Sequence, residues 1–180
     1  MWQMIKSLKS SGFTILELMI TIAVVGVLAA FALPSFNYTI QNNRVKTAAS
    51  DAHMSLLLAR SEAIKRNNNV RVKFNSNGWS VAYWDPDAST PDYVTLTDKT
   101  DLSSDVNYDP YLGGTEQSLP QDIVFNRSGR LDPSTNSVSI ELRFTSSKLN
   151  TIPLRCVSLS LSGRPKVETD SDGDATNGCG

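Results

Sequence analysis

The chain has 180 residues, which at roughly 150 residues per domain is one domain with an additional segment rather than two full domains. Its formal net charge of −1 gives no general preference for a polyanionic partner, and 40% apolar residues exclude a wholly disordered chain. One histidine and two cysteines cannot make a four-ligand zinc site, and the sequence offers no nucleophile–base pair or phosphate-binding loop. We therefore expect no enzyme activity, no cofactor and no bound metal.

The N-terminal segment is basic and then strongly apolar. Residues 1–12 contain Lys6 and Lys9 and no acid, and no charged side chain occurs from Leu18 to Asn43. About 20 apolar residues in a helix span the roughly 30 Å core of a bilayer. Because basic flanks stay on the cytoplasmic side, the remainder of the chain is expected to face the periplasm or exterior.

An ordinary secretory signal is the alternative interpretation, with a cleavage site at Ala30-Phe31-Ala32. Glu17 argues against it, since a carboxylate near the start of an apolar helix is costly in a membrane and is by default a functional residue.

The run Gly12-Phe13-Thr14-Ile15-Leu16-Glu17 resembles the processing site of a type IV prepilin. Pro34 lies where that family places a helix kink, and the order Ile15-Leu16 reverses the commoner one. The resemblance implies that prepilin peptidase removes a leader, residues 1–12, between Gly12 and Phe13, and that Phe13 is then N-methylated. It also implies that 13–43 is the transmembrane and polymerisation half of a retained helix.

The same resemblance gives Glu17 a role in assembly. A carboxylate in a low-dielectric helix bundle can pair with the new N-terminal ammonium of its own or a neighbouring subunit, whereas an unpaired one is heavily penalised. Glu17 is therefore predicted to set the register of polymerisation.

A globular head over 44–180 should follow, beginning with an amphipathic helix over 44–66. Its apolar stripe recurs at three- and four-residue intervals and should lie on a sheet, with His53 beside it as a structural residue. The stripe comprises Val45, Ala48, Ala49, Ala52, Leu56, Ala59 and Ala63. The triplet Asn67-Asn68-Asn69 is expected to end the helix.

Strands are expected after this helix. Alternation over 70–74 and 79–84 around Asn75-Ser76-Asn77-Gly78 predicts a hairpin, and 85–122 is expected to be a long loop with at most a short strand at 93–96. Further strands are expected at 123–125, 138–144 and 154–161. The predicted fold is α+β, with the long kinked helix of the type IV pilin fold on antiparallel sheets.

Two later segments resemble the FimT/GspH (FimU-like) branch of minor pilins and pseudopilins. They are Ile123–Arg130, which ends in Ser128-Gly129-Arg130, and Leu159–Lys166, which ends in Gly163-Arg164-Pro165-Lys166.

Cys156 and Cys179 are the chain's two cysteines, and in an exported protein they are expected to form one disulfide, with two free thiols as the alternative. That bond would tie down a polar tail over 168–180. The acids of Asp170–Asp174 resemble part of a calcium loop but lack a bidentate glutamate, which favours a solvated acidic turn.

Charge is distributed in blocks. Residues 44–73 hold seven basic side chains against two acids, 85–122 hold nine acids against Lys99, and 127–166 hold seven basic side chains against two acids. These blocks fit complementary subunit faces or solvated surface. Some FimT-type proteins bind DNA through a C-terminal Gly-Arg-x-Arg segment, which Arg164 and Lys166 match in part, although four acids follow between Glu168 and Asp174.

The resemblance implies a minor pilin that co-assembles with other minor and major pilins to initiate or cap a type IV pilus. Before assembly it would lie in the bacterial inner membrane with its head in the periplasm, and afterwards in a pilus or pseudopilus, at the tip. The alternatives are a GspH-like minor pseudopilin of a type II secretion system and a DNA-binding minor pilin of natural transformation.

Overall fold

The computed structural model describes residues 12–87, 92–174 and 177–179, without the side chains of 31–35. The chain divides into two compact units, Met1–Asn37 (the N-terminal unit) and Tyr38–Gly180 (the head unit). The described elements are helix α1 (Ile15–Arg66) and strands β1 (Val70–Asn75), β2 (Gly78–Asp85), β3 (Asp92–Lys99), β4 (Val106–Leu112), β5 (Thr115–Glu116), β6 (Gln121–Phe125), β7 (Ile140–Ser146), β8 (Arg155–Leu159) and β9 (Pro165–Thr169).

Both ends of α1 are capped by their own sequence. The Thr14 hydroxyl accepts a hydrogen bond from the Glu17 amide at 3.2 Å, as an N-cap residue does. At the other end, the Asn68 amide donates to the Ala63 carbonyl at 3.1 Å and the Asn67 amide donates to the Ile64 carbonyl at 3.2 Å. Asn67 has a φ of 50°, which completes a Schellman motif and confirms the predicted end of the helix.

Over the described residues, no stretch of helix combines the length and apolarity that crossing a membrane requires. The transmembrane segment expected within 13–43 is thus not confirmed and stays a prediction.

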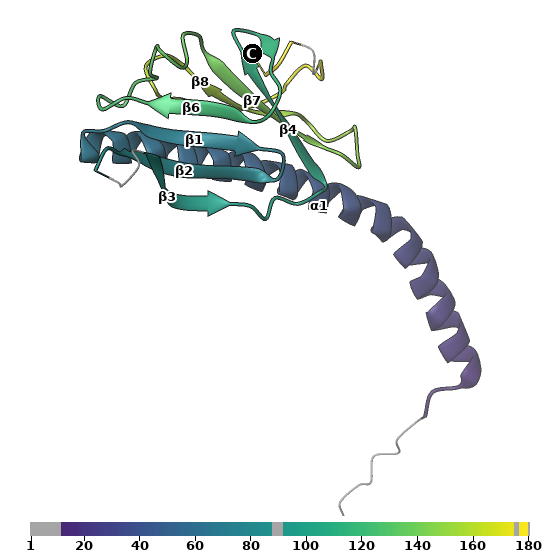
Figure 1. The fold of residues 1–180 in the computed structure, drawn as a ribbon. Coiled ribbons are helices and arrows are strands. Elements are labelled where there is room, and N and C mark those ends of the chain that lie inside the picture. Colours follow the sequence, from purple (N-terminus) through teal and green to yellow (C-terminus); the bar gives the residue numbers. More distant parts are fainter. Residues whose placement is uncertain (1–11, 88–91, 175–176, 180) are drawn as a thin grey trace, which may run out of the picture. The chain divides into compact units, whose positions relative to one another are not determined.

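Nine strands of the described residues form two antiparallel sheets in the head unit (Figure 1). The order is β3-β2-β1-β6 in the first sheet and β5-β4-β7-β8-β9 in the second. The predicted hairpin is confirmed as β1 and β2, which pair from Val70↔Tyr83 to Asn75↔Gly78. Gly78 has a φ of 138°, and a Cβ there would lie 1.7 Å from the Lys99 carbonyl oxygen, so only glycine fits this turn.

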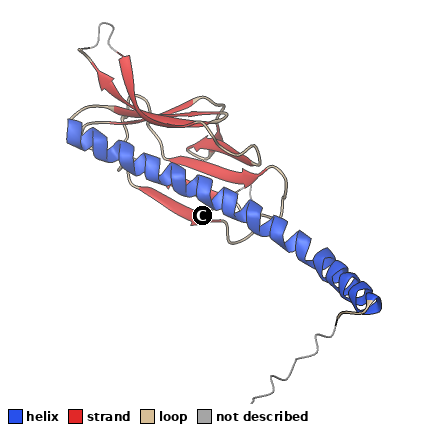
Figure 2. Ribbon diagram, turned by 90° about the horizontal axis from the view of Figure 1, so that it is seen from below, coloured by secondary structure: helices blue, strands red, loops and turns tan. Residues whose placement is uncertain are grey.

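The head part of α1 runs along the sheets and buries the predicted stripe against them (Figure 2). All seven stripe residues are buried, with at most 4% of any of them exposed. Five of the seven are alanines, whose small side chains let the helix backbone approach the sheets closely. The prediction of a helix packed on antiparallel sheets is therefore confirmed.

An aromatic cluster joins α1 to both sheets at the centre of the head unit. The Trp79 indole donates a hydrogen bond to the Ser55 hydroxyl of α1 at 2.8 Å, and its ring lies 6.4 Å from that of Phe144 in β7. Tyr108 of β4 stacks on Phe144 at 5.4 Å and donates to the Gly78 carbonyl at 2.8 Å. Burial raises the pKa of the Tyr108 phenol, which therefore remains a neutral hydrogen-bond donor.

The short strand predicted at 93–96 is confirmed within β3, but the rest of the predicted long loop over 85–122 is wrong. That segment also contains β4 and β5, and β4 pairs along its whole length with β7. In β4, buried Val106 and Tyr108 alternate with exposed Asn107 and Asp109, as in a strand that covers the core with one face. The polar tail expected from residue 168 is also shorter, because β9 extends to Thr169 at the sheet edge.

Candidate functional site

The predicted processing site lies at the start of the described chain. Phe13 has 77% of its surface exposed, and nothing comes within 4 Å of a Cβ built on Gly12. The rest of the predicted leader, residues 1–11, lies outside the described residues. Cleavage after Gly12 and methylation of Phe13 stay predictions, but neither position is covered by other parts of the described chain.

Glu17 lies in the first turn of α1, three residues after the Thr14 cap. An acidic side chain at this place favours the helix, because it faces the positive end of the helix dipole. Glu17 therefore stabilises the first turn of α1 within one chain. A test of its predicted role in assembly must separate that role from this local one.

The helix that follows Glu17 is apolar on every side. Ten large apolar side chains between Ile15 and Leu28 each expose more than half of their surface: Ile15, Leu16, Leu18, Met19, Ile20, Ile22, Val24, Val25, Val27 and Leu28. A helix that is apolar all round is stable only when other apolar groups surround it. The described part of the N-terminal unit thus exposes a continuous apolar surface.

Pro34, the predicted kink, lies within α1, but its side chain falls outside the described ones. The kink stays a prediction.

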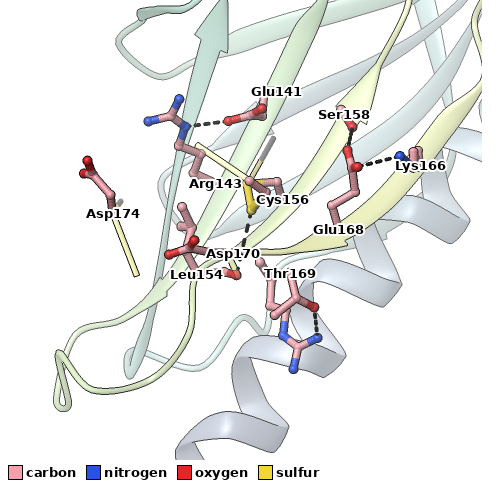
Figure 3. Close-up of a disulfide and its surroundings, with 12 residues drawn as sticks. Glu141, Arg143, Leu154, Cys156, Ser158, Lys166, Glu168, Thr169, Asp170 and Asp174 are labelled. Carbon is pink, nitrogen blue, oxygen red and sulfur yellow. Dashed lines mark hydrogen bonds and ion pairs between the residues drawn. A yellow bond between two sulfur atoms is a disulfide. The ribbon is translucent and has the colours of Figure 1, made fainter. Parts of the chain in front are cut away.

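The predicted disulfide is present. Cys156 of β8 and Cys179 are bonded, with their Cα atoms 5.9 Å apart, and this bond holds the C-terminal tail against the second sheet (Figure 3). The Asp170 amide donates to the Leu154 carbonyl at 2.9 Å where the tail leaves β9. The tail's acidic turn is closed by its own hydrogen bonds, such as that from the Asn177 amide group to Asp172 at 2.9 Å. The hydrogen bond from Asn177 lowers the pKa of Asp172.

Two Gly-Arg pairs lie against each other in the head unit, one in the segment Ile123–Arg130 and one in the segment Leu159–Lys166. A Cβ on Gly163 would be 2.1 Å from the Gly129 carbonyl oxygen and 3.1 Å from the Arg130 Cα. The Leu131 amide donates to the Leu161 carbonyl at 3.3 Å beside this contact. The turns that carry Arg130 and Arg164 are therefore neighbours.

The first of these turns is rigid. The Asn126 side chain accepts hydrogen bonds from the Ser128 amide at 3.0 Å and the Arg130 amide at 3.2 Å. Gly129 also packs on the end of α1, where its Cβ would lie 3.2 Å from the Arg60 Cγ. The two turns and the stem of Arg60 therefore lie at one end of the head unit. We call the arginines that they carry the arginine cluster: Arg60, Arg127, Arg130 and Arg164.

Within the described chain, no member of the arginine cluster forms an ion pair. Lys166, the second residue of the predicted DNA-binding pair, differs in this respect. Its ammonium pairs with Glu168, and the hydrogen bond from Lys166 lowers the pKa of that carboxyl. The structure thus places Arg164 with three further arginines that the sequence analysis did not select, while Lys166 is already neutralised.

A buried polar cluster also escaped the sequence analysis. Asp105, with 4% of its surface exposed, accepts a hydrogen bond from Gln41 at 3.0 Å and forms ion pairs with Lys148 at 2.9 Å and with Arg44. It links α1 to the segments before β4 and after β7. Nothing in the local sequence distinguishes Asp105 from the eight other acids of the segment 85–122. Its partners are distant in sequence: Lys148 lies 43 positions away, Arg44 lies 61 and Gln41 lies 64.

Comparison with known sequences identifies the family. The profile of the type II transport protein GspH family matches residues 48–163, more than half of the chain. This chain belongs to the GspH family. Residues 7–33 of the GspH-family chain also match the prokaryotic N-terminal methylation motif, which confirms the resemblance to type IV pilin-like proteins.

Solved structures share the fold of this GspH-family chain. The type IV minor pilin FimU of Pseudomonas aeruginosa superposes with a TM-score of 0.53 at 19% identity, over 70% of this chain and 89% of FimU. The minor pseudopilin EpsH from the type 2 secretion system of Vibrio cholerae superposes at 0.54 with 17% identity, over 69% of this chain and 94% of EpsH. Escherichia coli GspH superposes with a TM-score of 0.51 at 16% identity, over 73% of this chain and 92% of that GspH chain. The α+β pilin fold is confirmed.

The curated relatives share a short segment with this chain. The type IV major fimbrial protein FimA of Dichelobacter nodosus is 49% identical over 45 residues, which is 25% of this chain and 28% of FimA. The GspH-family chain is thus type IV pilin-like, and it spans about a quarter of the length of the curated relatives that it matches.

Proposed function

We propose that this GspH-family chain is a minor pilin that co-assembles with other minor and major pilins to initiate or cap a type IV pilus. The observation that carries the proposal is the all-round apolar helix of the N-terminal unit, whose single charged residue, Glu17, lies four residues after the exposed Phe13. A bundle of such helices buries every apolar face and brings carboxylates and N-terminal ammonium groups together.

Processing follows from the same segment. Prepilin peptidase cuts after Gly12, and the Phe13 amine is then methylated. Until it assembles, the chain is held in the inner membrane by residues 13–43, and its head lies in the periplasm. After assembly it occupies the pilus tip. The match of residues 7–33 to the methylation motif supports these steps.

The nearest alternative is a minor pseudopilin of a type II secretion system, since EpsH and FimU share this fold about equally well. Deleting the gene separates the two roles. A pilus subunit predicts that surface pili fall at least about tenfold while secretion of exoproteins is retained, and complementation restores the pili. Loss of secretion with normal pili would contradict the pilus assignment, and normal pili with normal secretion would contradict both.

The arginine cluster favours a second candidate function, DNA binding by the same scaffold. Its guanidinium groups come from two packed turns and from α1, and each has a fork of donors that suits phosphate oxygens. The acids after Lys166 oppose this function less than the sequence suggests, because Glu168 is paired with Lys166 and Asp172 accepts a hydrogen bond from Asn177.

Binding of the detergent-solubilised full chain to duplex DNA tests this candidate. The triple variant Arg127→Ala/Arg130→Ala/Arg164→Ala should weaken binding and lower the slope of log K against log salt by about 0.9 for each lost phosphate contact. Lys73→Ala, which removes a cation from β1 instead, is the matched control. No binding at low salt, or equal losses in the triple variant and the control, would end this candidate.

A further inference from the structure

A pocket of about 500 Å³ lies on the second sheet of the head unit, on the face turned away from α1. Its floor is made by side chains from adjacent strands, including Tyr111 of β4, Arg143 of β7 and Ser158 of β8. Arg164 and Lys166 form one side of the pocket, and Asn177 of the C-terminal tail forms another. Its volume falls within the roughly 300–1,000 Å³ that is usual for small-ligand pockets.

The disulfide builds one wall of this pocket. Cys156 faces outward from β8 beside Arg143, its partner in the strand register, and the bond to Cys179 brings the tail over that surface (Figure 3). Gly178 presses closely on the floor, since a Cβ there would lie 2.5 Å from the Glu141 Oε1 and 2.7 Å from the Arg143 Nη2. The tail's position, and with it that of Asn177, therefore depends on a covalent bond.

The polar groups of the floor are held in fixed positions. Arg143 donates to Glu141 at 2.6 Å, and its guanidinium carbon lies 3.8 Å from the centre of the Tyr111 ring. Next to them, the Ser158 hydroxyl donates to Glu168 at 2.9 Å, and Glu168 also binds Lys166 (Figure 3). Because these side chains are already ordered, a ligand does not need to order them on binding.

The lining combines positive charge with hydroxyl groups. Three cations, Arg143, Arg164 and Lys166, line the pocket with one acid, Glu141. Arg143 is paired with Glu141 and Lys166 with Glu168, so Arg164 carries the positive charge that forms no ion pair within the described chain. Hydroxyl groups come from Tyr111, Ser139, Ser158 and Ser160, and Asn177 adds an amide. A ligand that matches this lining carries a carboxylate for the exposed Arg164 and several hydroxyl groups for the serines and Asn177.

The geometry points to a binding site for an acidic saccharide of the uronic acid class in this pocket. The sugar carboxylate lies against Arg164, and the sugar hydroxyls exchange hydrogen bonds with Ser139, Ser160 and Asn177. The site is separate from the helix that carries assembly, and it differs from the DNA-binding candidate, because Arg60, Arg127 and Arg130 do not line it.

Calorimetric titration of the oxidised full chain in detergent with tetragalacturonate tests the site, with neutral cellotetraose as the control sugar. Tetragalacturonate should bind at one site per chain and cellotetraose should not. Arg164→Ala should weaken binding about tenfold, as the loss of a charge-assisted contact does. Ser160→Trp, which fills the pocket without removing a charge, should abolish binding.

The matched control is Arg127→Ala, which removes an exposed arginine from the neighbouring turn outside the pocket and should leave saccharide binding unchanged. No binding of tetragalacturonate, unchanged binding in Ser160→Trp, or equal losses in Arg127→Ala and Arg164→Ala would each overturn the assignment. The last outcome would indicate a diffuse attraction of polyanions to the arginine cluster. If duplex DNA competes with tetragalacturonate and Arg127→Ala relieves this competition, the saccharide binds at the arginine cluster and not in the pocket.

Discussion

The Glu17→Ala variant should reach the membrane in normal amount, and its incorporation into pili or co-assembly with other pilins should fall at least about tenfold. In the proposed bundle, each carboxylate would face the N-terminal ammonium of its own or a neighbouring chain in a low-dielectric environment. Removing the carboxylate leaves that ammonium buried and unpaired. The measurement is the ratio of variant to wild-type protein in sheared pili, normalised to the membrane fraction.

Two further substitutions separate this pairing from the local role of Glu17 in the first helical turn. Glu17→Gln keeps the length and hydrogen-bonding capacity of the side chain but not its charge, and it should fail as Glu17→Ala does. Glu17→Asp keeps the charge and should retain part of the incorporation. Wild-type incorporation of the glutamine variant would show that the charge has no role in assembly.

Removing the disulfide is the second change from which we expect a large effect, here on the free energy of unfolding. The bond closes a segment of 23 positions between Cys156 and Cys179, and the loop-entropy relation gives it about 3–4 kcal/mol of stabilisation. The tail has little else to hold it, because Gly178 is the one buried residue among its described positions after Asp170. The variant Cys156→Ser/Cys179→Ser should lose about that amount of unfolding free energy, as measured by denaturant unfolding of the detergent-solubilised chain.

Reduced wild-type protein is the control, since it loses the bond but keeps both sulfur atoms. Its stability should equal that of the double variant and of Cys179→Ser alone. A loss below about 1 kcal/mol in the double variant would mean that the tail is held by its other contacts. The oxidised single variant Asn177→Ala should keep the stability of the wild type, because Asn177 bonds only within the tail's own turn.

The helix and its buried face could be predicted because their signals are local. Apolar residues at three- and four-residue intervals define the stripe from Val45 to Ala63, and the asparagines after Arg66 end the helix. The β1–β2 hairpin is predictable for the same reason, since Asn75–Gly78 is a tight turn between alternating strands. The processing motif at Gly12–Glu17 is likewise contiguous in sequence.

The strands that the sequence does not predict either bury only one of their two faces or lie at the edge of a sheet. β4 exposes Asn107 and Asp109 on one face and contains Pro110, so its composition resembles that of a loop although its alternation is regular. β9 is a short edge strand that borders an acidic tail. In both segments polar composition masks the strand period, and the partner strands supply the stabilisation.

The sites that escaped prediction depend on residues far apart in sequence. The turns that carry Arg130 and Arg164 are neighbours because Gly129 and Gly163 allow the two backbones to touch, and only the pairing of the strands brings those glycines together. Asp105 likewise meets Gln41 and Lys148 through the packing of α1 on the second sheet. The charge blocks along the sequence indicate neither the contact between these two turns nor the buried ion pairs of Asp105.

The mass of the N-terminal peptide of the mature protein, isolated from membranes and from sheared pili, tests the central claim most directly. The account predicts a chain that begins at Phe13 with one added methyl group on its amine, so that the apolar helix is retained. A chain that begins at Leu33, or one that still carries residues 1–12 in the assembled fibre, would contradict it.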